Sequence, residues 1–146
     1  MRYYKPRHFD IRELVPPELY NKYKSNVDTL YMLFDPRILW TADALRDKFK
    51  CPVIINDWST GGTHTQRGFR TDADTGAVFS QHRCGRALDM TILDISADDF
   101  RKMVRQKQLS FELMYVTRIE DSVSWIHLDV GNVDGTDIVF FTDSKK

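Results

Sequence analysis

Two histidines and one aspartate are the residues of this sequence whose types and spacing could do chemistry. His82 and Asp89 stand seven positions apart in the stretch Ser80–Asp89, and a second imidazole, His127, lies in the alternating segment 125–129. Two imidazoles and a carboxylate, brought together, form a three-ligand set for zinc that leaves a fourth coordination position open for water. The set is therefore a candidate catalytic metal site.

The surroundings of these residues favour a metal without requiring one. Asp89 falls inside an otherwise apolar strand-like run, where an unpaired carboxylate is costly to bury and a metal ion would remove that cost. Alternation in the segment 125–129 places its two aliphatic residues on one strand face and His127 and Asp129 on the other, toward a cleft. Spacing alone leaves open an internal hydrogen bond between His82 and Asp89 with no metal.

The elements that would position these residues follow from the hydrophobic pattern. Asp35 followed by Pro36 is typical of a helix start, and apolar residues spaced by three and four extend this helix to Phe49. A second capped helix begins at Ser96. Between them, the segment Ser59–Phe79 is long enough to be a functional loop. Strands are expected at 52–57, 87–92, 111–117, 124–130 and 137–142, with a hairpin turn at 120–123. This pattern predicts an α+β fold, a mainly antiparallel sheet with flanking helices.

The bulk properties limit the function classes. A chain of 146 residues has the length of one domain, in which residues 1–35 are expected to wrap aromatic side chains around the core. Lys and Arg together number 21, as do Asp and Glu, which argues against a nucleic-acid binder. The N-terminus has no apolar signal segment, and no apolar run approaches the roughly 20 residues of a membrane helix. We expect cytoplasmic synthesis without a signal peptide, no membrane insertion, and reduced thiols at Cys51 and Cys84.

The stretch Ser80–Asp89 also carries a resemblance to a known family. With the later histidine segment it resembles the zinc peptidases of the D-Ala-D-Ala carboxypeptidase group, which includes the vancomycin-resistance D,D-dipeptidases, phage endolysins and the hedgehog metal-binding domain. Upstream, 67–70 is similar to a Gly-Tyr-Arg stretch of those enzymes. The likeness spans roughly 50–130, and the whole chain most resembles small phage or prophage members. The shared frame reads Ser80-x-His82-x-x-Gly85-x-Ala87-x-Asp89, followed by Trp125-x-His127.

The resemblance implies a hedgehog/D-Ala-D-Ala-peptidase type of fold and a Zn²⁺ cofactor. It also implies that Arg70 binds the scissile carbonyl oxygen and stabilises the negative charge that develops on it. A guanidinium suits this role, because its interaction with an oxyanion is strong in a cleft from which water is excluded. The alternative for Arg70 is a loop salt bridge to Asp72 or Asp74. The metal ligands that the resemblance implies are His82, Asp89 and His127.

Two further residues receive supporting roles. Ser80 would hydrogen-bond substrate or brace a ligand, although plain turn chemistry is an open alternative. Asp129 would orient a ligand imidazole or contact substrate, or else be a polar residue on an exposed strand face.

The general base is not where the family usually has it. Many relatives carry a Glu three residues before the last zinc histidine, and this chain has Ser124 there. The preceding turn offers Glu120 and Asp121, and we choose Glu120 because its longer side chain reaches further back over the metal. If both are ordinary solvated turn acids, the protein would bind zinc without hydrolysing a substrate.

The function that this resemblance implies is hydrolysis of an amide bond in peptidoglycan stem peptides, in the manner of a carboxypeptidase or an endolysin. A phage-encoded enzyme of this kind would reach the cell wall through a holin or a virion. The alternative is a non-catalytic zinc-binding virion or binding module that keeps the fold. The bond cleaved and the oligomeric state are left open by the sequence.

Overall fold

The computed structural model describes residues 3–71 and 76–143 of the chain. Its α-helices are α1 (Pro17–Lys22), α2 (Pro36–Phe49) and α3 (Ala97–Arg105). Its strands are β1 (Val53–Ile54), β2 (Ala87–Ile92), β3 (Arg118–Glu120), β4 (Ile126–Asp129) and β5 (Val139–Phe141). Short 3-10 helices are η1 (Ile11–Glu13), η2 (Lys24–Leu33), η3 (Trp58–Thr60) and η4 (Gln81–Cys84).

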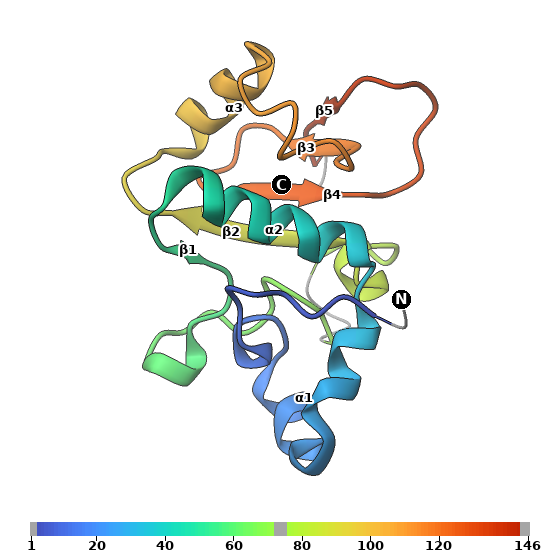
Figure 1. Cartoon of the computed structure of the whole chain (residues 1–146). Helices are drawn as coiled ribbons and strands as arrows, with labels where there is room; N and C mark the ends of the chain where they lie inside the picture. Colours follow the sequence, from blue (N-terminus) through green and yellow to red (C-terminus); the bar gives the residue numbers. More distant parts are fainter. Residues whose placement is uncertain (1–2, 72–75, 144–146) are drawn as a thin grey trace.

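The strands form one sheet in the order β1-β2-β4-β3-β5. The first four are antiparallel to their neighbours, and β5 lies parallel to β3. The sheet is therefore mixed but mostly antiparallel, which confirms the predicted α+β class. The parallel pair arises because the chain makes a wide excursion after β4 and returns along the far side of β3 (Figure 1).

Helix α2 confirms the prediction made from its cap and its apolar stripe. The Asp35 carboxylate accepts a hydrogen bond from the Arg37 amide, and Pro36 occupies the first turn. The helix ends where Lys50 takes a left-handed conformation with φ 54°. It runs across the sheet near β2 (Figure 1), and its completely buried apolar residues are Ile38, Leu39, Ala42 and Leu45. The capped helix predicted at Ser96 is α3.

Two strand predictions and one turn prediction need correction. Residues 111–115 form hydrogen-bonded turns, and β3 begins only at Arg118. The reason is that the buried residues of this region, Leu109, Leu113 and Val116, recur at spacings of four and three, which is a helical and not a strand period. The strand expected at 52–57 is limited to β1, and Glu120 belongs to β3 and not to a turn.

The N-terminal segment contributes to the same core as the sheet. Phe9, Tyr31 and Phe34 are buried within it, and Tyr20 packs against it. This packing reaches the candidate site at Gly85, which has φ 65° and lies so close to the Leu33 carbonyl that a Cβ would collide with it. The N-terminal segment therefore supports the turn that carries His82.

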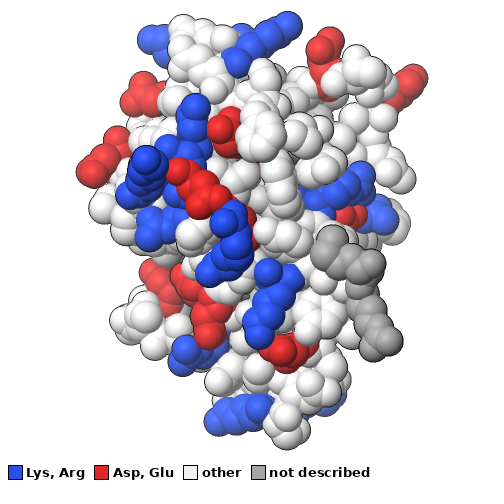
Figure 2. Space-filling model, in the orientation of Figure 1, with Lys and Arg blue, Asp and Glu red and all other residues white. Residues whose placement is uncertain are grey.

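Three expectations from the sequence concern the distribution of charge on the surface, membrane-spanning helices and the two cysteine thiols. On the face drawn in Figure 2, basic and acidic side chains are interspersed, in keeping with their equal numbers. Within residues 3–71 and 76–143, no helix combines the length and the apolar character needed to cross a bilayer. Cys51 and Cys84 are both free thiols.

Candidate metal site

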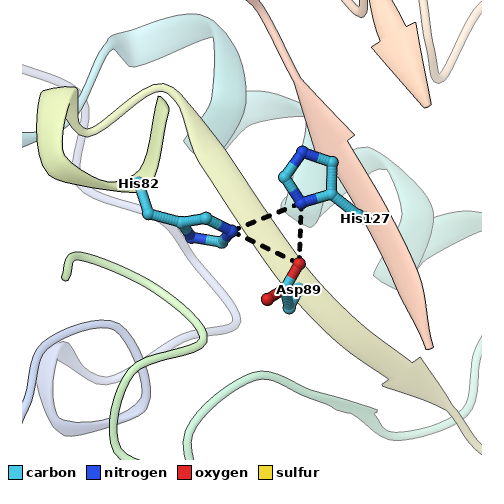
Figure 3. Close-up of side chains that lie close together, drawn as sticks. All are labelled: His82, Asp89 and His127. Atoms are coloured by element: carbon cyan, nitrogen blue, oxygen red, sulfur yellow. Dashed lines mark hydrogen bonds and ion pairs between the residues drawn. The ribbon is translucent and has the colours of Figure 1, made fainter. Parts of the chain in front are cut away.

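Three side chains of the metal-binding types converge on one point (Figure 3). His82 Nε2 lies 3.3 Å from His127 Nδ1 and 3.3 Å from Asp89 Oδ1, and Asp89 Oδ1 lies 2.7 Å from His127 Nδ1. Ligand atoms about 2.0–2.1 Å from a tetrahedral ion are about 3.3 Å apart, so two of the three spacings already match zinc. The sequence predicted this set, and the fold brings it together.

The second nitrogen of each imidazole has its own acceptor. His82 Nδ1 lies 2.9 Å from the Gly68 carbonyl oxygen, which can only accept, so this nitrogen carries the proton. His127 Nε2 lies 3.2 Å from Asp129 Oδ2. The Gly68 carbonyl thus leaves a free lone pair on His82 Nε2. His127 has a carboxylate at each nitrogen, with Nδ1 2.7 Å from Asp89 Oδ1, so a bound cation would replace the proton on Nδ1 while Asp129 keeps the one on Nε2. Two converging imidazole lone pairs beside a carboxylate fit a divalent cation.

The sheet register places two of the three ligand-type residues. Asp89 on β2 pairs directly with His127 on β4, so both side chains project from the same face. His82 comes from η4, just before β2. The preceding segment holds this arrangement together, because the Asp89 amide donates to the Arg67 carbonyl at 2.8 Å and the Arg70 amide to the His82 carbonyl at 3.3 Å.

The electrostatics of the buried triad follow from these contacts. Burial alone would lower the pKa of His127, but hydrogen bonds to Asp129 and Asp89 outweigh it and raise the pKa to about 9. Burial alone would raise the pKa of Asp89, but the two imidazoles hold it well below its usual range. The same balance, with His127 and Arg118 as partners, lowers the pKa of Asp129. Without a metal, His127 is a protonated imidazole between the carboxylates of Asp89 and Asp129.

Glu120 occupies the next place in the same cross-strand row. Arg118 pairs with Asp129 and Ile119 with Leu128, so continuing the register puts Glu120 opposite His127. Glu120 in turn pairs with Phe141 on β5. These side chains share one sheet face and line a pocket of about 450 Å³ with the metal-type residues. The predicted base thus lines the same pocket as the candidate metal ligands, although it stands on a strand and not on the expected turn.

Asp121, the acid set aside in favour of Glu120, has a different environment. Its carboxylate lies 3.4 Å from Arg101 Nε and 2.6 Å from Arg105 Nη2. It is absent from the pocket lining. Ser124, at the position of the family's usual Glu, is exposed and also absent from that lining.

Arg70 and Ser80 both line the pocket, as their predicted roles require. Arg70 Nη2 lies 3.4 Å from Asp89 Oδ2, and Nη1 lies 3.5 Å from Ser80 Oγ. Arg70 Nε donates to the Gln66 carbonyl at 3.2 Å. Its alternative partners, Asp72 and Asp74, lie outside the described residues. The guanidinium is therefore held at the edge of the metal-type set.

Two arginines that the sequence reasoning missed support the site. Arg118 binds the fully buried Asp129 carboxylate through Nε and Nη2 at 2.8–3.1 Å, so Asp129 is not on an exposed strand face. Arg101 is buried on α3 and donates to the Val123 carbonyl at 2.9 Å and to the Glu120 carbonyl at 3.4 Å. Its position on the apolar face of α3, beside Phe100, was the signal that it has a buried role.

Comparison with known proteins agrees with this site. The model of the Peptidase M15 family matches residues 12–129, and the chain belongs to this family, that of the zinc D-Ala-D-Ala carboxypeptidases. No curated protein and no solved structure gives a significant match. M15 peptidases are in general zinc-dependent and act on peptidoglycan-related peptides, so membership supports a metallopeptidase of this general kind.

Proposed function

We propose that this protein is a zinc-dependent peptidase that hydrolyses an amide bond in peptidoglycan stem peptides. The observation that supports the proposal most is the convergence of His82, Asp89 and His127 in a pocket that also contains an acid and a guanidinium, in a chain of the M15 family. His82, Asp89 and His127 would hold the ion. Zinc bound by three protein ligands polarises a carbonyl and lowers the pKa of a water molecule to about 7.

Glu120 is the proposed general base. Glu120 lines the same pocket as His127, and from there it would accept a proton from the reacting water. It would then return this proton to the leaving amine. The buried Arg101 holds the Glu120 backbone and thereby the end of β3.

Arg70 is the proposed electrostatic partner of the substrate. Its guanidinium would donate to the scissile carbonyl oxygen and stabilise the charge that develops there, an interaction that is strong in a dry pocket. Ser80, next to Arg70, would hydrogen-bond the substrate. Asp129 would keep the His127 ring in the orientation required of a ligand.

The proposal is tested by incubating the zinc-loaded protein with purified peptidoglycan and quantifying new amino and carboxyl ends. We expect release by the natural chain and its loss in His82→Ala and His127→Ala. An exposed-surface variant, Asp28→Asn, should behave as the natural chain. If no wall chemotype yields new ends while the protein is folded and metal-loaded, the proposed activity is wrong.

A non-catalytic metal-binding module of a virion is the second candidate. Ser124 favours it, because the family's usual Glu is absent from that position. Bound zinc, together with no hydrolysis by the natural chain, would establish this alternative. For the enzyme, we propose a phage-type role in which a holin or a virion brings the chain to the cell wall.

A further inference from the structure

A tight turn beside the metal pocket presents two large apolar side chains to solvent. Phe79 is 90% exposed and Val78 is 71% exposed, more than any other large hydrophobic side chain among the described residues. Turn tips are usually occupied by small or polar residues. Phe79 lines the pocket that contains His82, Asp89 and His127, whereas Val78 does not.

This turn is held in a defined conformation. The Ser80 amide donates to the Ala77 carbonyl at 3.0 Å, so Val78 and Phe79 are its two central residues. Arg83 Nη1 donates to the Val78 carbonyl at 3.2 Å. The exposure of Phe79 is therefore a property of an ordered turn that is fastened to η4, the element that carries His82.

Two further parts of the chain line the pocket together with the metal-type residues. One is the turn, with Phe79 and Ser80, and the other is the pair β3 and β5, with Glu120 and Phe141. Phe141 packs edge-on against the His127 ring, 5.7 Å between centroids. A peptide whose amide reaches the metal-type residues would enter the pocket that Phe79 lines.

We propose that Phe79 is a specificity-determining residue that contacts an apolar side chain of the substrate peptide next to the scissile bond. This inference rests on the proposed peptidase function. Successive residues of an extended peptide are about 3.3 Å apart, so the groups nearest the reacting amide belong to the peptide and not to a more distant glycan. Contact with an apolar side chain of the substrate would remove the apolar surface of Phe79 from water, which contributes favourably to the free energy of binding.

The test compares Phe79→Ala with Val78→Ala, which changes the same turn outside the pocket. Steady-state hydrolysis of a soluble stem pentapeptide by the zinc-loaded chain gives KM and kcat, and calorimetry in a Glu120→Gln background gives affinity. Losing this contact should raise KM and weaken binding about ten-fold in Phe79→Ala. We expect kcat to stay within about two-fold, and Val78→Ala and Phe79→Tyr to match the natural chain.

Each other outcome has a definite meaning. Equal binding by Phe79→Ala and the natural chain, or equal losses in both alanine variants, overturns the contact. A loss seen only when the pentapeptide carries its muramyl sugar overturns the assignment to the peptide. If the chain binds the pentapeptide without hydrolysing it, the proposed function fails, but a binding loss confined to Phe79→Ala still supports this inference.

Discussion

Asp89 and His127 face each other across the β2–β4 ladder, with Asp89 Oδ1 2.7 Å from His127 Nδ1. Two of the three candidate ligands are therefore fixed by strand pairing and not by a loop. The third, His82, is fixed by a short turn that leads directly into β2. A set built in this way is preorganised, because few torsions remain to be ordered when an ion binds.

Asp129→Asn should weaken zinc binding without removing a ligand. The substitution replaces the carboxylate that accepts from His127 Nε2 and orients the ring. Loss of such a partner typically reduces metal affinity about 10- to 100-fold. Chelator competition measures the affinity, and Asp28→Asn, which alters an exposed ion pair with Lys5, is the control. An unchanged zinc affinity in Asp129→Asn would show that Asp129 has no orienting role.

Glu120→Gln should lower kcat and leave zinc bound. A general base commonly contributes about 10²- to 10⁴-fold, and the glutamine keeps the size of the side chain while losing its basicity. Asp121→Asn is the matched control, because Asp121 follows Glu120 directly but pairs with Arg101 and Arg105 away from the pocket. If Asp121→Asn loses more activity than Glu120→Gln, the assignment of the base is wrong.

The metal-free protein should lose stability as pH rises from about 6.5 to about 9. The folded state raises the pKa of His127 from 6.5 to about 9, because hydrogen bonds to Asp129 and Asp89 outweigh the effect of burial. A raised pKa contributes stability that is complete below the unfolded value and is lost as pH passes the folded value. Urea unfolding with a chelator present should show this fall, and His127→Gln should flatten it. Parallel pH profiles for the two proteins would contradict the prediction.

Arg101→Met should destabilise the fold by about 3 kcal/mol, because it leaves buried carbonyl oxygens without their donor and removes one of the two arginines that pair with Asp121. The carbonyls concerned belong to Glu120, Val123 and Trp125. Denaturant unfolding measures the difference. Arg105→Met, which removes a half-exposed partner of the same carboxylate, should have the smaller effect, about 1 kcal/mol. Equal losses of stability in both variants would mean that Arg101 does not hold the segment 120–125 in place.

Local sequence signals were enough to predict helices α2 and α3, whereas α1 was not predicted. Asp35 and Ser96 cap α2 and α3 because each presents its side chain to backbone amides two or three positions ahead, which is a purely local interaction. His82, Asp89 and His127 could be selected because the frame Ser80–Asp89 and the later Trp125-x-His127 resemble those of the zinc D-Ala-D-Ala carboxypeptidase group.

The features of the fold and the site that were not predicted depend on which strands become neighbours. Local sequence does not encode that choice. The position of Glu120 in the pocket with His127 depends on the β3–β4 pairing, and the parallel approach of β5 follows from a long return of the chain. The strand predicted at 111–117 failed because its apolar residues belong to a turn-rich segment with helical spacing. The pairing of Arg118 with Asp129 is likewise a cross-strand contact.

The central claim, that His82, Asp89 and His127 form a zinc centre, is tested most directly by the metal content of the protein purified without chelator. We predict one zinc ion per chain that survives gel filtration, and its loss in His82→Ala and His127→Ala variants that remain folded by circular dichroism. A folded natural chain that contains no zinc and takes up none when the ion is offered would contradict the account.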